Sequence, residues 1–159
     1  MILSIKGYTF LIDDEDYEKV MKYTWQINKQ QEKLGRIYLQ TRLPSKEGRK
    51  HISFHRYIMG CINGDGKIVD HRDGNTLDCR KSNLRFCTKL ENARNCKRNS
   101  KNTSGYKGVS YRKDIKKWIA GVYIKKHRIH LGYFPTPELA RDAYVEASKK
   151  YYGDFRRTE

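Results

Sequence analysis

The segment from Ile68 to Asn95 carries side chains whose types and spacing suit hydrolysis. Asp70 and His71 are adjacent at the end of an apolar stretch, so a carboxylate and an imidazole should leave a strand where the chain turns. An imidazole with an ordinary pKa near 6.5 is mostly neutral at physiological pH and still takes a proton from water. The pair therefore predicts a general base beside an anionic metal ligand. The alternative is an ordinary turn with a solvated imidazole.

The end of the same segment predicts a capped helix that carries a second oxygen ligand. Thr88-Lys89-Leu90-Glu91 matches a capping box, with Thr88 as the N-cap and Glu91 at the third helical position. Asn92 then lies in the first turn of the helix. From there its carbonyl oxygen can join the Asp70 carboxylate around one hard divalent cation, which prefers oxygen ligands and keeps several waters.

Asn83 lies between these groups, twelve residues after His71 and nine before Asn92. Its amide can fix the connecting loop by bonding backbone groups on both sides, or it can simply cap the loop. A histidine, an asparagine and an asparagine at these spacings, across a strand, loop, strand and helix, resemble the HNH nucleases with a ββα-metal site. The phrases DHRDGNTLD, SNLRFCT and LEN resemble the branch found in phage and intron homing endonucleases.

This resemblance implies a role for each matching residue. Asp70 and Asn92 correspond to metal ligands, His71 to the general base and Asn83 to the loop-fixing asparagine. His55, in SFHRYIMG, also stands where that family has a histidine, although beside Phe54 and Tyr57 it reads equally well as a core residue. The expected cofactor is a divalent metal, Mg²⁺ with Mn²⁺ as an alternative, acting as a Lewis acid on the scissile phosphate.

Three arginines near this segment are candidates for binding phosphate oxygens, because a guanidinium offers paired donors in a fixed fork. They are Arg56, Arg72 and Arg85. For each one the alternative is an ordinary surface arginine.

The charge of the chain points to a polyanionic partner. The 159 residues include 34 Lys and Arg against 18 Asp and Glu, which gives a net charge of +16. Residues 94–159 hold 17 basic and 6 acidic residues, net +11, whereas residues 1–93 hold 17 and 12, net +5. Between Lys97 and Tyr133 there are 11 basic residues and the single acid Asp114. This density is typical of a nucleic-acid-binding face.

The C-terminal region has the pattern of a small sheet covered by a helix. Residues 105–112, 117–123 and 126–134 alternate apolar and polar side chains, which predicts three antiparallel strands with one solvated face. Thr136-Pro137-Glu138 is a helix start, and Gly153 is a stop. The helix should pack on the sheet through an apolar stripe formed by Leu139, Ala140, Ala143, Tyr144 and Ala147.

The phrases YKGVSYR, KKWIAGVYIKKHRIHLGYF and TPELARDAYVEASKKYYGDF resemble the DNA-binding domain of ethylene-response factors, also called the APETALA-type domain. In that family a three-stranded sheet lies in the major groove, and Trp118 matches a core position. The resemblance places the following residues toward DNA: Lys107, Ser110, Arg112, Gly121, Tyr123, Lys125, Arg128 and His130.

Several of these positions depart from the plant members, so the DNA sequence that is read does not carry over. Ser110 and Tyr123 replace arginine, Gly121 replaces glutamate and His130 replaces tryptophan. Lysine outnumbers arginine in this region, and arginine is the better reader of guanine. A grip on phosphates without sequence preference is therefore the alternative for this face.

The remaining segments are supporting ones. Residues 1–60 predict a hairpin at Ile2–Ile12 with a Lys6-Gly7 turn, a helix from Asp13-Asp14 through Tyr23, and strands near 37–43 and 51–57. A small core should form from Tyr8, Phe10, Tyr17 and Trp25, and Lys46–Lys50 should form a basic loop that touches DNA.

Residues 97–104 are predicted to be a basic linker. No C-x-x-C pair links the four cysteines, which argues against a zinc ribbon.

We therefore expect an α+β protein with a supporting region at 1–60, an HNH core at 61–96, a linker at 97–104 and a DNA-binding domain at 105–159. Its expected activity is metal-dependent cleavage of double-stranded DNA, with no membrane and no obligatory protein partner. A DNA-binding regulator with a decayed nuclease site, and a small RNA-binding protein, are the alternatives. Without a signal peptide or a long apolar run, the protein should be intracellular, in a bacterial cytoplasm or nucleoid, with reduced thiols.

Overall fold

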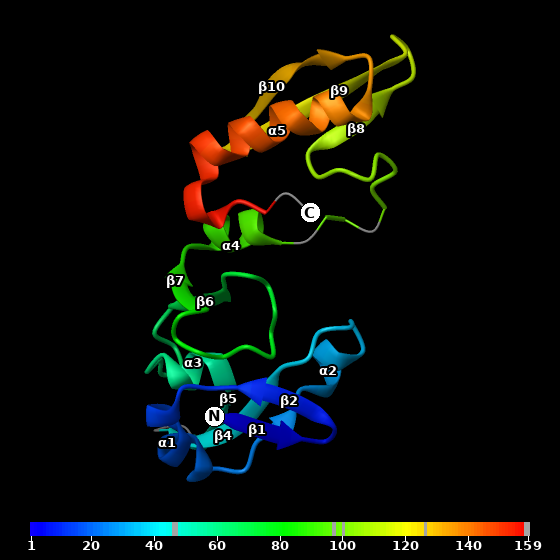
Figure 1. Ribbon diagram of the computed structural model, residues 1–159. Coiled ribbons are helices and arrows are strands. Elements are labelled where there is room, and N and C mark those ends of the chain that lie inside the picture. The colour runs from blue at the N-terminus through cyan, green and yellow to red at the C-terminus, as the bar shows by residue number, and fades with distance from the viewer. Residues whose placement is uncertain (46–47, 97, 100, 126, 158–159) are drawn as a thin grey trace. The chain divides into compact units, whose positions relative to one another are not determined.

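The computed structural model describes residues 1–45, 48–96, 98–99, 101–125 and 127–157. It divides into two compact units, Met1–Asn92 and Ala93–Glu159 (Figure 1). Helices and strands are mixed within the chain, and the second unit contains a three-stranded antiparallel sheet and a C-terminal helix, so the α+β class is confirmed.

The first unit begins with the predicted hairpin, β1 (Ile2–Ile5) and β2 (Tyr8–Leu11). Lys6 and Gly7 form the turn with φ of 50° and 82°, a left-handed pair that suits a two-residue hairpin. A short 3-10 helix, η1 (Asp14–Asp16), then leads into α1 (Tyr17–Met21). Asp13 does not cap this helix, because its carboxylate instead accepts a hydrogen bond from the Lys81 backbone N–H at 2.7 Å.

A three-stranded antiparallel sheet follows, in the order β3-β4-β5. Its strands are β3 (Gln26–Ile27), β4 (Leu39–Ser45) and β5 (Gly48–Ser53), with α2 (Lys29–Glu32) between the first two. The strand expected over 51–57 was wrong beyond Ser53, where α3 (Phe54–Ile58) begins. Phe54 and Ile58 are both buried, and a spacing of four places them on one face of a helix. Of the expected basic loop, residues 46–47 lie outside the described residues.

The segment that carries the candidate chemistry folds as two strands and a helix. Strand β6 (Ile68–His71) pairs antiparallel with β7 (Leu84–Cys87), and α4 (Lys89–Asn95) follows. The capping box is confirmed, because Thr88 N–H donates to Glu91 Oε2 at 2.7 Å and Glu91 N–H donates to Thr88 Oγ1 at 3.2 Å. Such reciprocal bonds fix where the helix begins.

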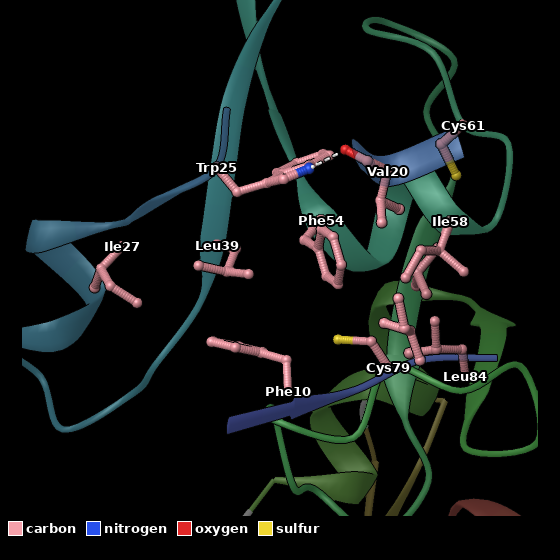
Figure 2. Close-up of a cluster of buried hydrophobic side chains, with 12 residues drawn as sticks. Phe10, Val20, Trp25, Ile27, Leu39, Phe54, Ile58, Cys61, Cys79 and Leu84 are labelled. Carbon is pink, nitrogen blue, oxygen red and sulfur yellow. Dashed lines mark hydrogen bonds between the residues drawn. The ribbon is translucent and has the colours of Figure 1, made fainter. Parts of the chain in front are cut away.

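One hydrophobic cluster holds the first unit together (Figure 2). Phe10 from the hairpin packs edge-on against Phe54 of α3, with ring centroids 6.2 Å apart, and Trp25 lies 4.6 Å from the same ring. Cys79 and Leu84, from the segment around β7, belong to the same cluster. The supporting region and the nuclease segment therefore share one core, which fixes β6 and β7 against the N-terminal elements.

The second unit matches the predicted sheet and helix. The sheet consists of β8 (Val109–Arg112), β9 (Lys117–Ile124) and β10 (His127–Phe134), and α5 (Pro137–Tyr152) lies along it (Figure 1). Thr136 caps α5, and Gly153 ends it with a φ of 53° and begins the 3-10 turn η2 (Gly153–Phe155). Ala140 and Tyr144 are buried against the sheet, but Leu139 is exposed.

Part of the expected linker is tied to this second unit. Asn102 donates from Nδ2 to the carbonyls of Tyr106 and Val109, and the Ser104 hydroxyl bonds the same two carbonyls. These bonds fold the segment into a turn before β8. None of the helices in the described part of the chain is long and apolar enough to cross a membrane.

Candidate functional site

Three aromatic rings from distant parts of the first unit meet at the end of β6. The imidazoles of His55 and His71 have centroids 5.1 Å apart. Tyr38, which directly precedes β4, places its ring 5.4 Å from His55 and 6.1 Å from His71. The structure thus brings His55 to the predicted general base. Sequence spacing gave no sign of Tyr38, because it lies 33 positions before His71 in the chain.

Burial lowers the pKa of both histidines. The pKa of His55 falls to about 3, first because its charged form is desolvated and then because His71 and Arg56 are nearby. The pKa of His71 is also lowered, because desolvation outweighs the attraction of Asp70, Asp73 and Asp78 for the charged form. Both rings are therefore neutral at physiological pH, and a neutral ring is the form that accepts a proton.

Asp70 is paired with a buried arginine on the neighbouring strand. Asp70 and Arg85 are direct partners across β6 and β7, and Arg85 donates from Nε and Nη2 to Asp70 Oδ2 at 3.1 and 2.9 Å. Asp70 is 8% exposed and Arg85 is 6% exposed. Arg85, predicted to clamp a phosphate, thus has its guanidinium directed at the carboxylate. The pair keeps a buried charge compensated.

Asn83 fixes the loop between β6 and β7, as its position in the sequence predicted. Its Oδ1 accepts from the Asp73 backbone N–H at 3.2 Å, and its Nδ2 donates to the Asp73 carboxylate and to the Asp78 carbonyl, each at 2.9 Å. Its own carbonyl accepts from Arg72 N–H at 2.8 Å. The amide therefore ties both halves of the loop that follows His71.

Cys79, on this loop, lies beside the general-base candidate. Its Sγ is 3.8 Å from Nε2 of His71 and 3.7 Å from the Thr76 carbonyl oxygen. Burial raises the pKa of Cys79, so it remains a thiol. A carbonyl oxygen only accepts hydrogen bonds, so the thiol proton points to Thr76. The sulfur is then placed to accept a weak bond from Nε2–H of His71.

The predicted metal ligands are an aspartate and an asparagine on different elements. Asp70 ends β6, and the partly buried Asn92 lies in α4, where its N–H donates to the Thr88 carbonyl. Among the described residues, no three His, Cys, Asp or Glu side chains form a group that could hold a metal ion. A carboxylate and an amide give a sparse set of oxygen donors, which fits a cation that keeps most of its waters and not a fully protein-bound ion.

The two remaining arginine candidates differ in their surroundings. Arg56 on α3 donates from Nη2 to Asp65 Oδ1 at 2.7 Å and to the Ile62 carbonyl at 2.9 Å, and from Nη1 to the Lys67 carbonyl. It therefore holds the 62–67 loop in place. Arg72 is exposed directly after His71, which leaves it at the surface beside the histidine pair.

The solvent face of the second unit's sheet carries most of the predicted DNA-facing residues. Ser110, Arg112, Tyr123, Lys125, Arg128 and His130 are all exposed. The Arg128 side chain lies close over Gly121. A Cβ on Gly121 would come within 2.6 Å of Nε of Arg128, so glycine leaves room for the guanidinium. Arg112 forms a bidentate pair with Asp114, donating from Nε to Oδ1 at 2.7 Å and from Nη2 to Oδ2. Trp118 packs against the core, as expected.

Lys107 does not lie on a strand. Its ammonium donates to the carbonyls of Arg94 and Cys96, both at 2.6 Å, and burial lowers its pKa. Arg94 in turn stacks on Tyr152, with its guanidinium carbon 4.6 Å from the ring centroid. Lys107 therefore holds the end of α4 to the rest of the second unit, and its ammonium is not displayed on the sheet face.

Comparison with known families agrees with this division of the chain. Residues 50–94 match the family model described as HNH endonuclease, and residues 104–154 match the AP2 domain model. Both resemblances seen in the sequence are thus confirmed, as a match to the HNH endonuclease model in one region and to the AP2 domain model in another. These matches support a DNA-binding, nuclease-like protein.

Among curated proteins, the chain is similar to Protein 3.8 of Escherichia phage T7. The two are 40% identical over 73 residues, which is 46% of this chain and 60% of the phage protein. The match therefore spans less than two thirds of that relative. No solved structure matches the chain.

Proposed function

We propose that the protein is a metal-dependent DNA endonuclease of the homing-endonuclease type, which hydrolyses a phosphodiester bond at a site held by the C-terminal AP2 domain. The observation that carries this proposal is the position of His71. It is a neutral, buried imidazole at the end of β6, beside Asp70 and at the start of the loop that Asn83 fixes. The HNH family match over residues 50–94 covers His71, Asp70 and Asn83.

His71 would take the proton from the attacking water. The water oxygen forms a bond to phosphorus, the bond between phosphorus and the 3′ oxygen breaks, and the proton passes from the water to the imidazole. If Nε2–H is directed at Cys79 Sγ, the lone pair lies on Nδ1, which is then the proton acceptor. His55 and Tyr38 pack against the ring and hold its orientation.

Asp70 and Asn92 would hold the divalent cation, Mg²⁺ or Mn²⁺. When bound, the cation supplies Lewis-acid stabilisation of the charge on the phosphate and on the leaving oxygen. Arg72, exposed next to His71, would contact a phosphate oxygen of the same DNA strand. Arg85 has a different role, because it compensates the Asp70 carboxylate when no cation is bound.

DNA binding would come mainly from the second unit, which carries a net charge of +11 over residues 94–159. Arg128 and Tyr123 lie exposed on the sheet, Lys125 lies exposed just after β9, and all three would meet the double-stranded DNA. Two exposed rings, those of His130 and Tyr133, contact each other with centroids 4.5 Å apart. A sheet with cations and flat rings suits contacts to phosphates and sugars.

One observation favours a second candidate, a DNA-binding regulator without cleavage. In the Asp70–Arg85 pair, the guanidinium of Arg85 already bonds the carboxylate that would bind the cation. The guanidinium and the cation would therefore compete for the negative charge of Asp70. If the pair cannot open, the site binds no metal and the protein only binds DNA.

The two candidates are separated by incubating the purified full chain with supercoiled plasmid, with and without Mg²⁺. The nuclease reading predicts nicked or linear plasmid in the presence of the cation. The regulator reading predicts a shift of the plasmid in the gel at low salt but no change in its topology under either condition.

A further inference from the structure

A polar groove of about 600 Å³ lies along the β3-β4-β5 sheet of the first unit. None of the described residues that line it is acidic. The side chains relevant to binding are Lys22, Gln26, Gln40, Arg42, Arg49 and His51. This surface is separate from the AP2 sheet, because all of it belongs to Met1–Asn92.

The strand register places these side chains on a single face. Gln26 is opposite Gln40, Arg42 is opposite His51, and Pro44 is opposite Arg49. Side chains alternate along a strand, so positions 40, 42 and 44 of β4 point away from the face that Leu39 buries in the core. The groove is therefore built on the outer face of a sheet whose inner face is fixed by the core.

A hydrogen bond orients Arg42 in the groove, and no carboxylate among the described residues neutralises either arginine. Arg42 donates from Nε to Nε2 of His51 at 2.9 Å, which holds the guanidinium against the strand pair. Over the residues that the structure describes, neither Arg42 nor Arg49 forms an ion pair with an acidic side chain. A fixed guanidinium without a carboxylate partner is suited to a phosphate.

Strand β4, which lines the groove, begins beside the histidine pair. Tyr38 directly precedes this strand, and its ring lies 6.1 Å from that of His71. From Tyr38 to Pro44 the strand spans roughly 20 Å at about 3.3 Å per residue. At 3.4 Å per base pair on each strand, this corresponds to about six base pairs of duplex.

We propose that this groove binds the sugar-phosphate backbone of duplex DNA over about six base pairs on one side of the bond that is cut. The arginines and Lys22 would meet phosphates, and the glutamine amides would bond phosphate or sugar oxygens. The position relative to the cut rests on the proposed nuclease function, whereas binding itself does not require cleavage. The nuclease unit then contributes its own contacts to the DNA.

The test compares two double variants of the full chain that remove the same charge. Arg42→Gln with Arg49→Gln changes the groove, and Lys29→Gln with Lys33→Gln changes exposed lysines at α2 that do not line it. Binding to a short mixed-sequence duplex is measured by fluorescence anisotropy in EDTA at several salt concentrations. Each lost phosphate contact lowers the slope of log K against log salt by about 0.9. The groove variant should lose nearly two units, and the control variant much less.

Hydroxyl-radical footprinting and mapping of the cleaved bond then locate the groove's contact on the DNA relative to the cut. With the groove variant, protection should disappear on one flank of the cut while protection elsewhere on the DNA persists. Arg49→Gln alone, which leaves the Arg42–His51 bond intact, should lose about one unit of slope, so misfolding cannot explain the result. If the groove variant and the control variant have equal salt slopes, the proposal is overturned. It is also overturned if the groove variant binds a double-stranded RNA probe more weakly but binds duplex DNA as the control does. If the groove variant has a lower salt slope but the wild-type protein never cuts plasmid, the groove still binds DNA and the proposed nuclease function is rejected.

Discussion

Arg85 and Asp70 face each other across β6 and β7, and the guanidinium donates twice to one carboxylate oxygen. Both side chains are buried. Removing one partner of such a pair leaves an uncompensated charge in the interior, which costs about 3 to 5 kcal/mol. We therefore expect Arg85→Met to lower the free energy of unfolding by about that amount in EDTA, as measured by urea denaturation.

The matched control is Arg72→Met, because Arg72 is exposed and directly follows β6. That change should alter the free energy of unfolding by less than about 0.5 kcal/mol. If Arg85→Met costs no more than the control, the Asp70 carboxylate is compensated by another group.

A second prediction concerns Cys79 and the tautomer of His71. Cys79→Ala removes the sulfur beside Nε2, so the ring no longer prefers the Nε2–H form, and cleavage should slow about five- to tenfold, the effect of one lost hydrogen bond. Cys79→Ser keeps an acceptor and should stay close to wild type. DNA affinity should be the same for all three proteins. ¹⁵N NMR of His71 that shows a protonated Nδ1 in the wild type would contradict this account.

The depressed pKa of His55 predicts acid sensitivity. Its folded-state pKa is about 3, below the ordinary 6.5, so the unfolded chain binds the proton between these values. The stabilisation is complete above pH 6.5 and is lost as the pH falls toward 3. Urea denaturation should show a loss of about 2 kcal/mol between about pH 7 and pH 5 from this group. His55→Gln should flatten this dependence, whereas His127→Gln, an exposed position, should leave it unchanged.

The structure changes what is expected of Lys107. Because its ammonium bonds two backbone carbonyls, Lys107→Met should destabilise the second unit by about 1 to 3 kcal/mol in thermal denaturation. It should leave the salt slope of DNA binding nearly unchanged. Arg128→Ala should do the opposite, lowering the slope by about one unit if it meets a phosphate. A lower slope for Lys107→Met with unaltered stability would return that lysine to the DNA interface.

Local patterns predicted most of the elements, and distant contacts could not be predicted. Thr88 and Glu91 lie three residues apart, and Lys6-Gly7 is a two-residue turn, so each pattern contains the whole interaction that it predicts. The partner of Arg56 is a loop aspartate nine residues away, and that of Arg85 is fifteen residues away across a strand pair. Neither spacing identifies a partner, so both arginines looked available for phosphate.

The strand predicted over 51–57 shows the same limit. Ile52, Phe54 and Ile58 are all buried, and their spacing fits alternation at first and a helical turn afterwards. Packing against Trp25 and Phe10 decides between the two, and those residues come from other elements. Tyr38 and Cys79 reach His71 in the same non-local way, which is why the sequence did not name them as site residues.

The central claim is that His71 takes the proton from the attacking water, and the most direct test is plasmid cleavage by wild type and His71→Ala with equal DNA binding. With Mg²⁺, the wild type should convert supercoiled plasmid to nicked or linear DNA, and the variant should be at least about 100-fold slower while binding a duplex as tightly. In EDTA neither protein should cut. Cleavage by His71→Ala at the wild-type rate, or no cleavage by the wild type with Mg²⁺, would contradict the account.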